Sequence, residues 1–146
     1  MFCHEQYRVL SERVKMKSLT IFLALTFSVM FSSSSYADWK KVGKKTQHAT
    51  YYVDFEKIRK HSETIQFWVL ADYVKSDKYG DWSWTVYYEG DCKLFRARIL
   101  SDLFHPQPMG QGFPTSSSSE PDEKWTHIST NSPSGDALKS VCAYTK

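Results

Sequence analysis

Apolar and polar residues alternate with a period of two through residues 50–103, and this pattern constrains the fold more than any other feature of the chain. The clearest run covers residues 64–74, TIQFWVLADYV, in which every odd position from Ile65 to Tyr73 is apolar or aromatic. Residues 50–55, 82–89 and 93–104 alternate in the same way. Such alternation, rich in β-branched and aromatic residues, is typical of half-buried strands. We therefore predict an antiparallel sheet of four to six strands.

The sequence between these runs predicts how the strands connect. Gly80 in residues 76–81 indicates a hairpin loop, and Gly90 indicates a bulge or tight turn before Cys92. Residues 39–46 favour a weaker edge strand, whose lysines discourage further pairing. A long segment from residue 105 to 124, with prolines, glycines and a serine run, has no periodicity and is interpreted as a surface loop.

A short helix is predicted at the C-terminal end. Ser132 can act as its N-cap, with Pro133 at the first helical position. Leu138, Val141 and Cys142 then share one face, which would lie on the sheet. The predicted class is α+β, with the sheet covered on one face by this helix.

Two runs allow individual side chains to be assigned to sheet faces. Trp82 and Trp84 alternate onto the same face as Val86 and Tyr88, which we interpret as core packing. In residues 93–104 one face carries the apolar side chains and the opposite face the charged ones. The apolar set is Phe95, Ala97, Ile99 and Leu103, and the charged set is Arg96, Arg98 and Asp102.

The N-terminal segment is typical of an export signal. A basic residue, Lys17, precedes an apolar run that ends in SSSSYA, with Ser35 and Ala37 at the −3 and −1 positions of a cleavage site. The apolar run is shorter than the ~20 residues that a membrane span needs. We predict a signal peptide over residues 1–37, with translation starting at Met16, and a single mature domain over residues 38–146.

Charge and cysteine content narrow the function of that domain. Residues 38–146 contain 15 basic and 14 acidic residues, so nothing in the charge points to a nucleic-acid partner. Two cysteines remain, Cys92 and Cys142, and in an oxidising compartment they most simply form a disulfide. On the loop-entropy model such a bond stabilises the fold by about 4 kcal/mol.

The sequence contains no motif typical of a catalytic site or a metal site. His48, His61, His105 and His127 fall in predicted turns or loops, and no serine elbow, phosphate-binding loop or zinc-ligand spacing is present. We predict no catalytic residues, metal or cofactor. His105 is the first histidine to test for any activity.

The pattern of aromatic and basic residues favours a binding surface over a catalytic site. Four side chains lie on faces opposite the apolar rows of their strands: Trp68, Tyr87, Arg96 and Arg98. If these faces share one side of the sheet, they form an aromatic and basic surface suited to a protein partner. The alternative is an ordinary solvated sheet face with stabilising cross-strand pairs.

Several segments resemble the surface-adhesin protein E family and follow one another in that family's order. They are TYYVDFEKIRKH (50–61), FWVLADYVK (67–75), YYEGDCKLFRARILSD (87–102), HPQPMGQG (105–112), EKW (123–125), NS (131–132) and LKSVC (138–142). The resemblance implies an antiparallel sheet with a C-terminal helix tied by a disulfide. It also implies a non-enzymatic role at the bacterial envelope, where named members are adhesins for host surface or matrix proteins. A lipid-anchoring cysteine would be expected after the signal, whereas Asp38 follows Ala37.

We therefore expect an exported, adhesin-like envelope protein, not an enzyme, that binds a protein partner through sheet and loop surfaces. The alternative is a soluble periplasmic inhibitor or stress-related partner of another envelope protein. The expected location is the periplasm, the medium or the cell surface, without a transmembrane anchor after cleavage. Exposed aromatic strand faces also favour a homodimer.

Overall fold

The computed structural model describes residues 37–145. Apart from Ala37, the predicted signal peptide and its start at Met16 lie outside the described residues. Within residues 37–145, no helix has the length and apolar character needed to span a membrane.

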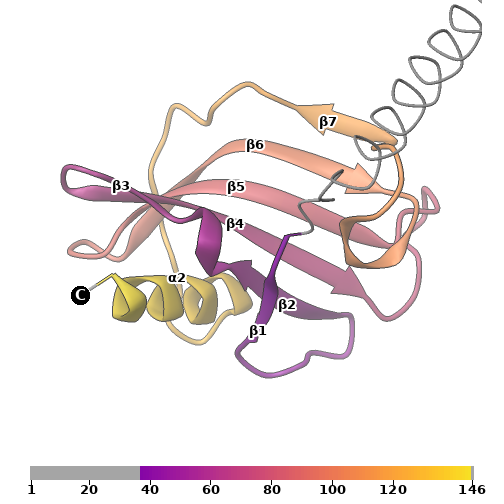
Figure 1. Cartoon of the computed structure of the whole chain (residues 1–146), viewed down its shortest axis with the longest axis horizontal. Helices are drawn as coiled ribbons and strands as arrows, with labels where there is room; N and C mark the ends of the chain where they lie inside the picture. Colours follow the sequence, from indigo (N-terminus) through magenta and orange to yellow (C-terminus); the bar gives the residue numbers. More distant parts are fainter. Residues whose placement is uncertain (1–36, 146) are drawn as a thin grey trace, which may run out of the picture. The chain divides into compact units, whose positions relative to one another are not determined.

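The described chain forms one antiparallel sheet and one α-helix (Figure 1). The strands pair in the order β1-β2-β4-β5-β6-β7, while β3 pairs with β4 and β8 pairs with β6. Their bounds are β1 Trp39–Val42, β2 Ala49–Asp54, β3 Arg59–His61, β4 Thr64–Tyr73, β5 Ser83–Asp91, β6 Arg96–His105, β7 Ser116–Ser118 and β8 Thr126–His127. The predicted sheet and class are confirmed. The strand number exceeds the prediction because β3, β7 and β8 are too short to show alternation.

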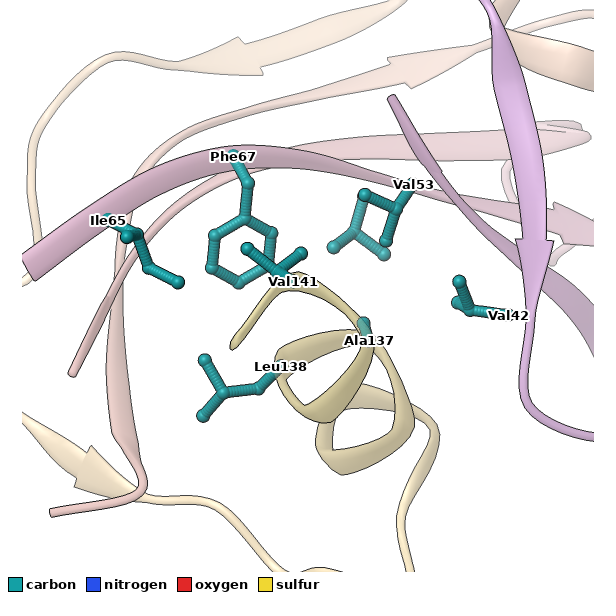
Figure 2. Close-up of a cluster of buried hydrophobic side chains, with 8 residues drawn as sticks. Val42, Val53, Ile65, Phe67, Ala137, Leu138 and Val141 are labelled. Carbon is teal, nitrogen blue, oxygen red and sulfur yellow. The ribbon is translucent and has the colours of Figure 1, made fainter. Parts of the chain in front are cut away.

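The helix α2, Pro133–Tyr144, begins as the sequence predicts. The hydroxyl of Ser132 accepts a hydrogen bond from the N–H of Gly135, and Pro133 occupies the first turn. The buried face of α2 packs on the sheet, where Leu138 and Val141 meet Phe67 (Figure 2). Burial of each such side chain stabilises the fold by roughly 1.5–3 kcal/mol. The core cluster comprises Val42, Val53, Ile65, Phe67, Val69, Ala137, Leu138 and Val141.

The predicted disulfide joins the helix to the sheet. Cys92 follows β5 directly and Cys142 lies in the last turns of α2, with Cα atoms 5.8 Å apart. The predicted pairing is confirmed. The bond therefore ties the turn between β5 and β6 to the helix that covers the core.

A β-bulge at Leu100 changes the faces predicted for the end of β6. Tyr87 lies opposite Ser101 while Tyr88 lies opposite Ile99, so one extra residue interrupts the alternation. Asp102 consequently lies on the helix side of the sheet, where its carboxylate accepts a hydrogen bond from Trp84 Nε1 at 2.9 Å. Leu103 lies on the opposite side, across from Thr85. The face assignments of Asp102 and Leu103 were thus wrong.

Three further expectations need correction. Trp82 is not in the core, because it precedes β5 and is 37% exposed. Gly90 lies inside β5 rather than in a bulge or turn. The predicted loop after His105 contains the short 3₁₀ helix η2, Pro108–Gly110, and the strand β7.

Candidate functional site

The sheet face opposite α2, here called the outer face, holds all four residues predicted to form a binding surface. Trp68 stands between Phe67 and Val69, which are buried beneath α2, so its side chain projects to the outer face. Tyr87 lies directly opposite Trp68. Arg98 lies opposite Glu89, and Arg96 lies opposite Asp91, on the neighbouring pair of strands. The four side chains therefore share one side of the sheet.

The aromatic pair on this face is stacked. The ring centroids of Trp68 and Tyr87 are 4.8 Å apart, with an angle of 22° between their planes. The hydroxyl of Tyr87 donates a hydrogen bond to Gln66 Oε1 at 2.9 Å. Both rings are half-buried, so part of each remains accessible to a partner. The stack and the hydrogen bond together limit the rotamers of both rings.

The two arginines are held by carboxylates. Arg98 Nη2 lies 2.7 Å from Glu89 Oε2, and Arg96 Nε lies 3.1 Å from Asp91 Oδ2. The arginine side chains are 30% and 33% exposed, respectively. Because each cation has its own anion, this group carries no net charge and presents guanidinium groups of fixed orientation.

Trp125 completes this arrangement, although the sequence did not suggest it as part of the site. The guanidinium carbons of Arg96 and Arg98 lie 4.8 and 5.2 Å from the centroid of its ring, which is the geometry of cation–π contacts. Trp125 directly precedes β8, whose two residues pair with β6 at Arg96 and Ala97. A two-residue strand has no recognisable sequence pattern, so this contact could not be predicted.

Two more aromatic residues extend the outer face toward the edge of the sheet. Tyr52 lies opposite Leu70, two residues along β4 from Trp68, and so is its diagonal neighbour. Trp39 in β1 lies opposite Asp54 in β2 and is on the same side of the sheet as Tyr52. Both are half-buried. The alternation of residues 50–55 already separated Tyr52 from the apolar row and was the available signal.

A strap formed by residues 106–112 covers the other end of the outer face. The N–H of Met109 donates to Asp72 Oδ1 at 2.7 Å, and the N–H of Gly110 donates to Ser83 Oγ at 2.9 Å. A side chain at Gly110 would press on Thr85, and its φ of +71° suits glycine. The strap therefore limits the accessible part of the face to the aromatic and arginine end.

The four histidines of residues 37–145 lie in different parts of the fold, with His48 just before β2, His61 in β3, His105 at the end of β6 and His127 in β8. His105 is the last residue of β6 and only 6% exposed, so its placement in a loop was wrong; its Nε2 lies 3.0 Å from Thr85 Oγ1. His61 and His127 end short strands, which also differs from the prediction, and both are exposed. Between residues 37 and 145, no group of three or more His, Cys, Asp or Glu side chains is placed to hold a metal ion.

Comparison with known proteins agrees with this fold. Two crystal structures of Haemophilus influenzae protein E are similar to the chain. One, crystal form II, is 18% identical to this chain with a TM-score of 0.57, and the similarity spans 74% of this chain and 90% of the protein E chain. The other is 16% identical with a TM-score of 0.54 and covers 72% and 83%. At such identities the likeness concerns the fold alone. A comparison with curated protein sequences finds no match.

The family assignment rests on the sequence model of surface-adhesin protein E. This model matches residues 39–143, which include every strand and nearly all of α2. The resemblance seen in the sequence segments is thereby confirmed. The chain belongs to the surface-adhesin protein E family.

Proposed function

We propose that this chain is an exported, adhesin-like protein of the bacterial envelope that binds a protein partner through its outer face without catalysing a reaction. Family membership supports the adhesin-like role. In this proposal residues 1–37 are removed as a signal peptide and residues 38–146 act as one mature domain. The domain then works in the periplasm, in the medium or at the cell surface.

The observation that carries the proposal is that the aromatic and arginine side chains of the outer face are held in fixed orientations. Trp68 and Tyr87 are stacked, and beside them two arginines contact Trp125 while paired to carboxylates. Tryptophan, tyrosine and arginine dominate the binding energy of protein interfaces. Side chains already held in one orientation lose little conformational entropy when a partner binds. This face therefore has both the composition and the rigidity of a binding surface.

The test is binding of the purified mature domain to a panel of host matrix proteins. We expect saturable binding to at least one of them, weakened about 10-fold or more by Trp68→Ala, as for an interface residue that contributes strongly. Trp82→Ala is the matched control, since Trp82 is an exposed tryptophan outside the outer face. Circular dichroism and thermal unfolding would show that both variants remain folded.

The proposal also predicts accessibility on cells. Antibodies against the mature domain should label intact cells if the partner is a host protein. No saturable binding, together with no labelling of intact cells, would contradict the adhesin-like role. Equal losses from Trp68→Ala and Trp82→Ala would contradict the assignment to the outer face.

A further inference from the structure

The strand β1 forms one margin of the sheet (Figure 1). It pairs with β2 along all four of its residues, and no strand between residues 37 and 145 pairs with its other side. In an antiparallel pair, alternate residues direct their N–H and C=O groups away from the partner strand. Such an edge is a template to which another extended chain can add by backbone hydrogen bonds.

Basic side chains gather at this edge. Lys40 and Lys41 lie in β1, and Lys44 and Lys45 lie in the turn that follows, all four exposed. Of these, only Lys40 takes part in the ion pairs formed among residues 37–145, with Asp38 at 2.9 Å. The mature domain as a whole is nearly neutral, with 15 basic and 14 acidic residues. The excess positive charge is therefore local to the β1 edge.

The C-terminal end of β1 is anchored to the core and to α2. Val42 at the end of β1 is buried in the core cluster with residues of α2. The turn after it begins at Gly43, which has a φ of +64° and lies so close to Asp136 of α2 that a side chain there would collide with its carboxyl group. A strand anchored at its end in this way needs little ordering when a partner adds to it.

We propose that β1 is a docking edge for an extended acidic segment of a protein partner. The segment would add as a strand beside β1, with its backbone hydrogen-bonded to the free side of β1. Its carboxylates would lie near Lys41, Lys44 and Lys45. The same lysines disfavour pairing of two β1 edges from two copies, because like charges would then face each other. Charge thus selects an acidic strand over a second copy.

The test uses a synthetic peptide of alternating glutamate and threonine, labelled for fluorescence anisotropy, with the mature domain at low salt. We expect the triple variant Lys41→Glu/Lys44→Glu/Lys45→Glu to weaken binding about 10-fold or more, since exposed charges steer and stabilise such contacts. The control reverses three exposed lysines elsewhere, Lys75→Glu/Lys78→Glu/Lys124→Glu, with the same change in net charge. This control should bind the peptide within about 3-fold of the wild type at matched ionic strength.

A second peptide separates strand addition from simple charge attraction. N-methylation of alternate residues removes the backbone donors of one edge while leaving every carboxylate in place. Methylation in one of the two alternating registers should abolish binding, and methylation in the other should leave it intact. Equal binding of both methylated peptides, equal losses in the two triple variants, or no binding at low salt would each overturn the proposal. Lys41 lies opposite Tyr52 on the outer face, but the peptide measurements involve neither Trp68 nor a host matrix protein. Their failure would therefore leave the proposed adhesin-like function unaffected.

Discussion

The indole of Trp68 stacks on the phenol of Tyr87 across two neighbouring strands, with ring centroids 4.8 Å apart. Aromatic pairs of this kind contribute about 0.5–1.5 kcal/mol beyond the area they bury. A double-mutant cycle with Trp68→Ala and Tyr87→Ala should therefore give a coupling of about that size in urea unfolding. Tyr87→Phe, which keeps the ring and removes the hydrogen bond to Gln66, should retain most of the coupling. Additive effects of the two alanine variants would show that the rings do not stabilise each other.

The disulfide should carry a measurable share of the stability. Replacing both Cys92 and Cys142 by serine should lower the free energy of unfolding by about 2–4 kcal/mol, because the closed loop spans 50 residues. Non-reducing mass analysis of the wild-type mature domain should show a deficit of two protons relative to the reduced form. An unchanged midpoint of urea unfolding in the serine variant would contradict the stabilising role.

The parts of the fold that could be predicted from the sequence are those governed by local pattern. The alternation in β4 and β5 spans whole strands, and the cap at Ser132 needs only the neighbouring residues. Alternation separated Trp68, Tyr87 and Arg98 from the apolar rows of their strands, and this part of the candidate site was accessible to sequence reasoning. That the three side chains share one side depended on the pairing of β4, β5 and β6, which the sequence left as a condition.

The remainder depends on pairing between distant segments. The bulge at Leu100 exists only relative to β5, so the faces of Asp102 and Leu103 could not be read from β6 itself. The position of Trp125 over the arginines depends in the same way on the two-residue strand β8. Trp82 was wrongly assigned to the core because the alternation was extended to the residue before β5. That residue lies outside the paired strand, so its side chain is not fixed on one face of the sheet.

The carboxyl of Asp91 should make the stability depend on pH in the acid range. Hydrogen bonds from the N–H of Leu94, from Arg96 and from the N–H of Lys93 lower its pKa below the ordinary value of 3.8, although burial opposes the shift. Such a carboxyl, whose pKa is lower in the folded state than in the unfolded state, stabilises the fold at pH values above its pKa in the unfolded state. That stabilisation is lost as the pH falls through the lowered pKa.

Comparison with Asp91→Asn isolates this charge, because asparagine keeps one oxygen acceptor at nearly the same position. The difference in unfolding free energy between wild type and variant should be largest near neutral pH and should shrink as the pH falls below 3.8. Urea unfolding at a series of pH values measures it. A difference that stays constant from neutral pH to about 2 would contradict the charge-based account.

Gly90 and Leu138 are packed so closely that adding a single methyl group at Gly90 should lower the stability of the domain. A Cβ added at Gly90 would lie 2.8 Å from Leu138 Cδ1 and 3.0 Å from Phe67 Cε1. Gly90→Ala should therefore destabilise the domain by about 1–3 kcal/mol, as overpacking of a core does. Leu138→Ala alone should destabilise it by about 2–5 kcal/mol, because it leaves a cavity under α2. In the double variant the contact with Leu138 Cδ1 is gone and only Phe67 still presses on the new methyl group, so Gly90→Ala should cost less in the Leu138→Ala background than in the wild type.

Gly80→Ala provides the contrast for this pair. Gly80 lies in the loop between β4 and β5 with a φ of +91° and nothing within 4 Å of an added Cβ, so any loss comes from its backbone conformation. Its effect should be the same with Leu or Ala at position 138, since the two sites share no partner. If Leu138→Ala relieved both glycine substitutions equally, or neither, the close contact between β5 and α2 could not be the cause, and the packing of the helix on the sheet would have to differ from that described above.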